Sequence, residues 1–158
     1  MPDHPLADWN TRIIAEFREN AGYVAWSSPE EVATGRPVPP HQPGFPEKGI
    51  SLILVHHVGA KTGKARISPL FYQPVGDSWA VFATHGGSPR DPAWYRNLMA
   101  HPRTVVEAGA ERIPVEARLT AGEERARIWA DQIALVPKFA EFEAASGRQI
   151  PVVLLERR

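Results

Sequence analysis

The chain has 158 residues, a length that folds as a single domain and buries enough surface to need no disulfide or metal. It contains 18 basic and 18 acidic side chains and no cysteine. The balanced charge argues against a nucleic-acid partner, and the lack of cysteine excludes disulfide scaffolds, thiolate metal sites and cysteine nucleophiles.

No apolar run approaches the roughly 18 residues of a membrane span, so stable membrane insertion is not expected. The first residues also lack a basic cluster followed by an apolar segment, as a secretory signal would have. We therefore expect a cytoplasmic protein. Peripheral association with the inner face of the membrane, through an aromatic N-terminal helix, is the alternative.

The N-terminal third predicts a helix and then a long loop. Trp9, Ile13 and Phe17 recur every four residues, Asp8 is placed to cap the helix start, and Gly22 is placed to end it, so residues 8–21 predict an amphipathic helix. Residues 27–49 contain six prolines and three glycines. That composition excludes a regular element and favours a loop lying over the body of the single domain, residues 1–158.

The rest of the chain predicts strands interrupted by helices. Apolar runs indicate strands at 51–58, 65–72, 78–84, 104–108, 111–119 and 152–155. Their turns are too short for crossovers, so the sheet is mostly antiparallel. Asp91 and Thr120 are placed to cap two further helices, which end near Pro102 and Pro137, and residues 138–145 continue as a helix after a kink. We expect an α+β fold in which about six strands form a barrel or a barrel with a broken wall.

The turn between the first two long strands, Gly59-Ala60-Lys61-Thr62-Gly63-Lys64-Ala65-Arg66, is basic. Residues 48–76 contain four basic side chains and no acidic one, which predicts an anion-binding patch. The turn is not a Walker phosphate loop, because its glycine spacing differs, Ala65 follows the lysine and the next element is a strand. A solvated hairpin turn that carries lysines for solubility is the alternative.

The segment 84–98, THGGSPRDPAWYRNL, is a second candidate site. Paired glycines after a strand allow the backbone to approach a ligand, and the N-terminus of the following helix presents unpaired N–H groups. An ordinary strand-to-helix turn is the alternative. His56 and His57 point to opposite faces of a strand and cannot share a metal, so no metal site is expected. No serine-hydrolase or dinucleotide motif is present.

These two segments, with Ser68-Pro69-Leu70 and Arg148-Gln149-Ile150-Pro151-Val152, resemble the F420-dependent nitroreductase family of deazaflavin-dependent split β-barrel oxidoreductases. The similarity runs from about Trp9 to Leu155. It implies a split β-barrel that holds coenzyme F420 in a groove, with FMN as the alternative cofactor. Lys61, Lys64 and Arg66 would neutralise the phosphodiester and polyglutamate tail. The implied cofactor contacts are Lys61, Thr62, Gly63, Lys64, Arg66, Ser68, Pro69, Leu70, Thr84, His85, Gly86, Gly87, Arg90, Ala93, Trp94 and Asn97.

The resemblance further implies an F420H2-dependent reductase that passes a hydride to an apolar quinone, enone or nitro compound, with no catalytic side chain. Substrate contacts are expected from Phe71, Val136, Phe139 and Phe142. The last three stand where relatives place tyrosines, so their hydroxyls are missing here. An FMN-dependent oxidoreductase and a non-catalytic deazaflavin- or tetrapyrrole-binding protein are the alternatives. The protein would be a monomer or a homodimer.

Overall fold

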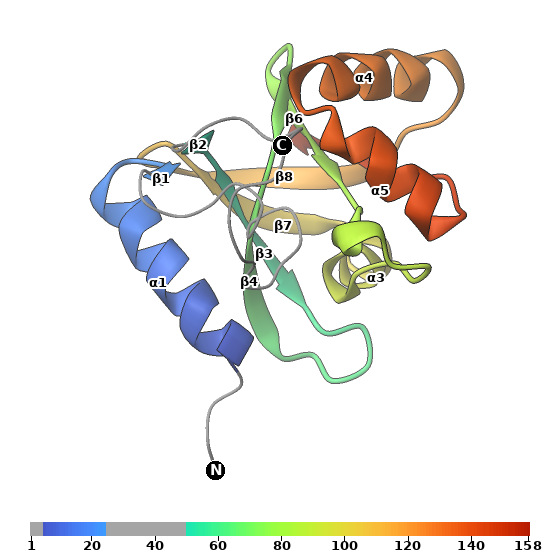
Figure 1. Cartoon of the computed structure of the whole chain (residues 1–158). Helices are drawn as coiled ribbons and strands as arrows, with labels where there is room; N and C mark the ends of the chain where they lie inside the picture. Colours follow the sequence, from blue (N-terminus) through green and yellow to red (C-terminus); the bar gives the residue numbers. More distant parts are fainter. Residues whose placement is uncertain (1–4, 25–49) are drawn as a thin grey trace.

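The computed structural model describes residues 5–24 and 50–158. The segment 27–49, for which a loop is predicted, lies outside the described residues. The described part is α+β, with a curled antiparallel sheet that carries helices on both faces (Figure 1). The predicted fold class, a split β-barrel built mostly from antiparallel strands, is confirmed.

Seven strands form the main sheet, in the order β4-β3-β7-β8-β9-β6-β5. Every neighbouring pair is antiparallel. The strands are β3 (Ile53–Val58), β4 (Ala65–Leu70), β5 (Gln73–Val75), β6 (Ser78–Phe82), β7 (Arg103–Ala108), β8 (Glu111–Leu119) and β9 (Val152–Arg157). A two-stranded sheet pairs β1 (Tyr23–Val24) with β2 (Ile50–Ser51). The short strand β5 was not predicted separately.

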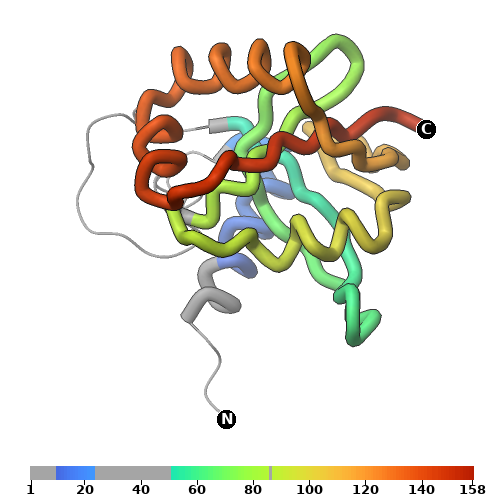
Figure 2. The backbone as a smooth tube through the Cα atoms, turned by 90° about the vertical axis from the view of Figure 1, so that its right-hand side faces the viewer, coloured from blue at the N-terminus to red at the C-terminus, as the bar shows by residue number. Residues whose placement is uncertain are grey.

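The helices in the described part are α1 (Pro5–Glu19), α3 (Ala93–Ala100), α4 (Gly122–Leu135) and α5 (Lys138–Ser146), and a short 3-10 turn, η1, spans His85–Gly87. Figure 2 shows α4 and α5 stacked together along one side of the molecule. The sequence predicts the four α-helices, and α5 begins at the predicted residue, but the starts of the other three differ from the prediction.

The predicted caps are wrong at three helix starts. Helix α1 begins at Pro5, ahead of Asp8. Pro92, not Asp91, is the N-cap of α3, and Ala121, not Thr120, is the N-cap of α4, without a side-chain cap in either case. Asp91 instead accepts a bond from Arg148, and the Thr120 hydroxyl donates to the Val152 carbonyl. Tertiary partners thus take the side chains that local spacing assigns to the helix ends.

Alternate strand residues divide the core into two layers, as the two-residue repeat of a strand requires. Leu54 and Phe82 face α1, α4 and α5, where they meet Phe17 and Phe139. The other layer contains Ile53, Val55, Val81, Val153, Trp94 and Leu98, and α3 covers it. The pocket described below opens where the ends of β3 and β4 leave this core.

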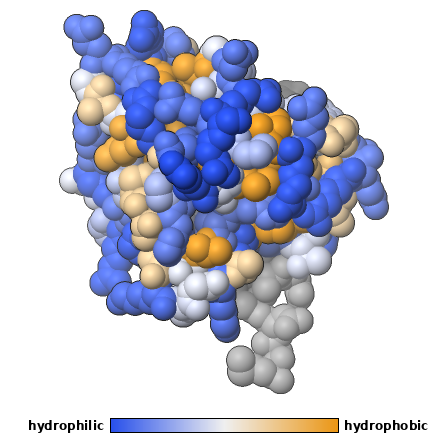
Figure 3. Space-filling view, turned by 180° about the vertical axis from the view of Figure 1, so that it is seen from behind, coloured by the Kyte–Doolittle hydropathy of each residue, from blue (hydrophilic) through white to orange (hydrophobic). Residues whose placement is uncertain are grey.

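The outer surface seen from behind is mostly hydrophilic, and its apolar side chains form small separate patches (Figure 3). Within residues 5–24 and 50–158, no helix is both long enough and apolar enough to span a bilayer.

Candidate functional site

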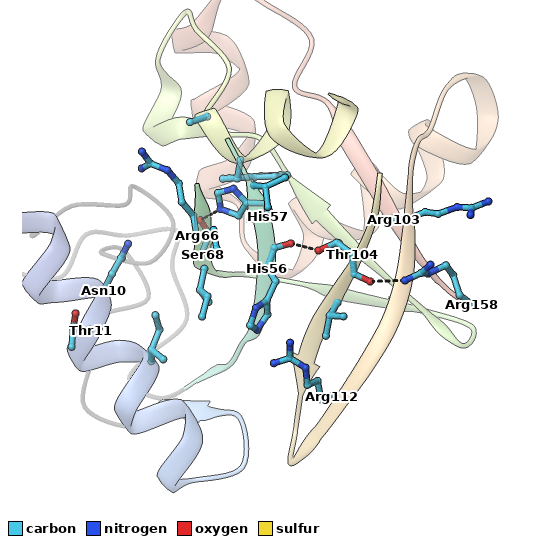
Figure 4. A pocket seen from close by; sticks show the side chains of 17 residues that line it. Asn10, Thr11, His56, His57, Arg66, Ser68, Arg103, Thr104, Arg112 and Arg158 are labelled. Carbon is cyan, nitrogen blue, oxygen red and sulfur yellow. Dashed lines mark hydrogen bonds between the residues drawn. The ribbon is translucent and has the colours of Figure 1, made fainter. Parts of the chain in front are cut away.

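A pocket of about 920 Å³ lies where β3 ends and β4 begins, between the middle of α1 and the start of α3. Its lining combines cationic, polar and apolar side chains from distant parts of the chain. In Figure 4, His57, Arg66 and Ser68 lie together on the β3–β4 side, and Arg103, Arg112 and Arg158 lie on the opposite side. The lining residues are Asn10, Thr11, Ile14, His56, His57, Val58, Ala65, Arg66, Ile67, Ser68, Ala93, Trp94, Arg103, Thr104, Val105, Arg112 and Arg158.

The pocket exists because β3 and β7 separate. Their paired positions end at Val55 and Val106, although β3 continues to Val58. Beyond that point the Thr104 hydroxyl, rather than a ladder of backbone bonds, donates to the His56 carbonyl. The residues that follow on β3 are therefore open to a ligand on the β7 side.

The basic turn, residues 59–66, borders the pocket and extends away from the body of the molecule (Figures 1 and 2). Two backbone bonds of 2.9 Å, from Gly59 N–H to the Lys64 carbonyl and from Gly63 N–H to the Gly59 carbonyl, hold its shape. Gly63 has φ +69°, which a residue with a Cβ adopts only with strain. The turn therefore has one defined conformation.

Lys61, Lys64 and Arg66 are exposed, and their side chains have no hydrogen bond or ion pair with any described residue. Three cations without an anionic partner in the described structure make the basic turn locally positive, although the chain as a whole is neutral, and one of them, Arg66, lines the pocket. This arrangement suits an anionic group, because a surface cation without an internal partner keeps its full capacity for charge-assisted bonds.

A chain of hydrogen bonds connects the basic turn to the pocket wall. The Ala60 backbone N–H donates to Asn97 Oδ1 at 2.9 Å. Asn97 Nδ2 lies 3.0 Å from His57 Nδ1, and His57 Nε2 lies 2.9 Å from Ser68 Oγ. Asn97 and His57 are buried, and Ser68 reaches the pocket. The predicted cofactor contact Asn97 thus uses both ends of its amide inside the protein.

The imidazole of His57 is held in its neutral form. The pKa of His57 falls to about 4, mainly because the ring is buried. The charges of Arg66, its cross-strand partner, and of His56 lower this pKa further. A neutral imidazole has one nitrogen that donates and one that accepts. His57 therefore acts at physiological pH as a fixed dipole within the hydrogen-bond chain.

His56 belongs to a second network at the pocket. Its Nε2 lies 2.7 Å from Glu107 Oε2, and Arg18 from α1 makes two bonds to the same carboxylate at 2.9 and 3.1 Å. The pKa of Glu107 falls to about 2, mainly because Arg18 donates hydrogen bonds to its carboxylate. The hydrogen bond with His56 lowers this pKa further. Both imidazoles thus have polar protein partners, and they take part in separate networks.

The second predicted segment packs against the C-terminal part of the chain. Arg148 donates to the carbonyls of Ala83 and Ser88 at 3.0 and 3.2 Å and to Asp91 Oδ1 at 2.8 Å. A Cβ on Gly87, which has φ +85°, would lie 3.3 Å from the Cβ of Ala145 in α5. The positive φ and this close approach between η1 and α5 explain why a glycine occupies position 87.

The four predicted substrate contacts lie in the core. Phe71, Val136, Phe139 and Phe142 are 1–7% exposed, and Phe139 packs with its ring centroid 5.7 Å from those of Phe71 and Phe142. None of them lines the pocket. Their role in substrate binding stays a prediction.

The structure brings part of the predicted cofactor site together at the pocket. Arg66, Ser68, Ala93 and Trp94 line it, and the turn 59–63 with Lys64 lies beside it. Pro69 and Leu70 continue β4 away from it, and Asn97 contacts it only through His57. Thr84, His85, Gly86, Gly87 and Arg90 belong to η1 and the turn held by Arg148. Their contact with a cofactor also stays a prediction.

Sequence reasoning missed the contributions of α1, β7, β8 and the residue after β9, and most of those of β3 and β4. These lining residues are Asn10, Thr11, Ile14, His56, His57, Val58, Ala65, Ile67, Arg103, Thr104, Val105, Arg112 and Arg158. Of these residues, only His57 could have been predicted from the sequence. It precedes the basic turn and lies on the same face of the predicted hairpin as Arg66, so it is placed to contact the same ligand.

Comparison with known proteins gives consistent results. The sequence profile of the F420H(2)-dependent quinone reductase family matches residues 40–157. An F420H(2)-dependent quinone reductase of Mycobacterium tuberculosis is 36% identical over 121 residues, which cover 73% of this chain and 77% of the relative.

Two solved structures are also similar. An F420-H2 dependent reductase, FDR-A, is 36% identical with a TM-score of 0.61, over 66% of this chain and 93% of that one. A protein described as a domain-swapped dimer is 30% identical with a TM-score of 0.63, over 95% of this chain and 98% of that one. The matches support F420 and give no support to FMN. The chain therefore belongs to the F420H(2)-dependent quinone reductase family of split-barrel F420H2-dependent reductases.

Proposed function

We propose that this reductase binds the anionic tail of F420H2 at the basic turn and reduces an apolar quinone in the adjoining pocket. The observation that carries the proposal is a set of three cations without a partner among the described residues, beside a pocket of about 920 Å³. Arg66 lines the pocket, and Lys61 and Lys64 belong to the turn between the lining residues Val58 and Ala65. When bound, the deazaflavin supplies the hydride.

The residues around the pocket fit this cofactor. The three cations suit a phosphodiester and a polyglutamate tail. Trp94 supplies an apolar surface and Ser68 a hydroxyl, both of which line the pocket. The protein's own contribution is to bind, orient and shield the reactants.

The substrate class is inferred from the residues that the family resemblance assigns to the substrate, none of which lines the pocket. Val136, Phe139 and Phe142 offer no hydroxyl to a nitro or quinone oxygen, and they form an apolar layer behind β4 and β6. We infer that hydrophobic quinones are reduced best, hydrophobic enones next, and bicyclic nitroimidazoles least.

The similar domain-swapped dimer supports a homodimer for this chain, which light scattering would test.

The test is a titration of the full chain with F420, followed by the quenching of deazaflavin fluorescence, with FMN as the comparison ligand. The double variant Lys61→Ala/Lys64→Ala should bind F420 about tenfold or more weakly. Arg127→Ala, which removes an exposed cation from α4, is the matched control and should bind normally. Equal binding by all three proteins would remove the basic turn from the site.

A further inference from the structure

The backbone fixes the direction of every hydrogen bond in the chain that ends at Ser68. The Ala60 N–H can only donate, so the atom of Asn97 that it meets is the acceptor Oδ1. The other end of the amide is then Nδ2, which donates to His57 Nδ1. Because that nitrogen accepts, the proton of the neutral imidazole is on Nε2, which donates to Ser68 Oγ.

Ser68 is left with a hydrogen to donate. Its oxygen accepts from His57, and its own O–H makes no hydrogen bond to any other described residue. Ser68 also lines the pocket, where Figure 4 shows it beside His57. The O–H is therefore available to an acceptor in the pocket, and His57 cannot reverse its own bond without a clash between two donors at Asn97.

We propose that His57 is a positioning residue that holds the Ser68 hydroxyl as a hydrogen-bond donor toward a carbonyl or phosphate oxygen bound in the pocket. The proposal rests on the proposed function, since the oxygen belongs to the cofactor or to the quinone. It also assigns a role to Asn97 and Ala60, which connect the basic turn to the same donor.

The surroundings of His57 preserve this arrangement. Arg66 stands opposite it in the β3–β4 register, and His56 is its neighbour along the strand. Burial, Arg66 and His56 all disfavour the charged ring, in which a second proton on Nδ1 would oppose the Asn97 amide, and the pKa of His57 is accordingly about 4. No carboxylate contacts the ring among the described residues.

The tautomer is tested first, without cofactor. Nitrogen-15 NMR of the full chain with labelled histidine should show His57 neutral and protonated on Nε2 from about pH 5 to about pH 8. A proton on Nδ1, or a charged ring in this range, would overturn the proposal. This measurement does not require F420 to bind, so it is independent of the proposed function.

Ligand binding and turnover test the role of the donor. Ser68→Ala and His57→Phe should each weaken either F420 binding or the apparent affinity for quinone by about two- to tenfold, as the loss of one hydrogen bond does. The double variant should be no weaker than Ser68→Ala alone, because His57 acts through Ser68. Additive losses, or no loss in either variant, would contradict the proposal.

Further variants separate positioning from folding. His57→Gln keeps a side-chain N–H for Ser68 and should recover most of the loss seen in His57→Phe. Ser78→Ala, the same change on β6 outside the pocket, is the matched control and should leave binding unchanged.

A change in the dissociation constant of F420 assigns the oxygen to the cofactor. A change only in the KM for quinone assigns it to the substrate. Failure of wild-type protein to bind F420 would refute the proposed function while the tautomer result stands.

Discussion

The side chain of Glu107 connects three elements of the described structure, α1, β3 and β7. It lies on β7, accepts two bonds from Arg18 on α1, and contacts His56 at the pocket. Its carboxylate is 15% exposed, so the bonds to it are stronger than those of an ordinary surface pair. The same residue thus holds α1 on the sheet and orients a pocket imidazole.

Glu107→Gln should lower the free energy of unfolding at pH 7 by on the order of 1 to 2 kcal/mol. The loss is limited to this range because Arg18 is half exposed and solvent screens its attraction to Glu107. The pKa of Glu107 falls from 4.5 to about 2 on folding, so its contribution is complete above about pH 5 and is lost as the pH falls toward 2. Urea unfolding at pH 7, 5 and 3 should show the two proteins converging at low pH. Glu116→Gln, in an exposed pair with Arg103, is the control. A constant difference at all three pH values would contradict this account.

Among the secondary-structure elements, the C-terminal part of the chain holds the η1–α3 turn in place. Arg148 follows α5 and donates to the carbonyls of Ala83, after β6, and Ser88, and to the carboxylate of Asp91. These bonds connect residues about sixty positions apart, so no local pattern predicts them. They hold the turn against the C-terminal part of the chain.

Arg148→Lys should destabilise the protein by about 1.5 to 3 kcal/mol, because a single ammonium cannot replace a guanidinium that donates from three nitrogens. Thermal unfolding should show the loss. Arg96→Lys is the control, since Arg96 is exposed and donates only to the Asp91 carbonyl. If Arg148→Lys were as stable as the wild type, the contacts with Ala83 and Ser88 would not hold the turn.

The α4–α5 layer gives a second test at this scale. Phe139 is 1% exposed and lies among Phe71, Phe82 and Trp129. Phe139→Tyr should cost about 1 to 3 kcal/mol, because the new hydroxyl is buried without an acceptor. Chemical denaturation measures the loss of stability. Phe139→Leu, which changes the packing without adding a hydroxyl, separates the effect of packing from that of the buried hydroxyl. A stable tyrosine variant with increased nitroreduction would instead place residue 139 against the substrate.

For the whole molecule, the distribution of charge matters more than its sum. Equal numbers of acidic and basic side chains leave no net charge, yet the cations of the basic turn have no internal partner among the described residues. F420 binding should therefore weaken by about tenfold between about 0.05 M and about 0.5 M salt, as exposed charges are screened. F420 binding by the Lys61→Ala/Lys64→Ala variant should depend less on the salt concentration. A salt-independent wild type would point to buried contacts.

Sequence reasoning predicts the parts of the fold that local patterns determine. Alternating strands with short turns predict an antiparallel sheet, and β8 has the predicted bounds. The basic turn also emerges from its composition. The pocket was not predictable, because Thr104, Arg112 and Arg158 meet β3 only through the sheet order. The caps at Asp91 and Thr120 failed for the same reason, since distant partners compete for those side chains.

The place of β9 within the sheet constrains the order of folding. β9 is the strand latest in sequence, yet it lies between β8 and β6 and pairs with both. During synthesis, the β4-β3-β7-β8 sheet and the β5–β6 hairpin leave the ribosome without the strand that joins them, and their inner edges stay unpaired. Completion of the barrel must therefore wait until residues 152–157 pair with both β8 and β6, so the closure of the sheet is a late step of folding.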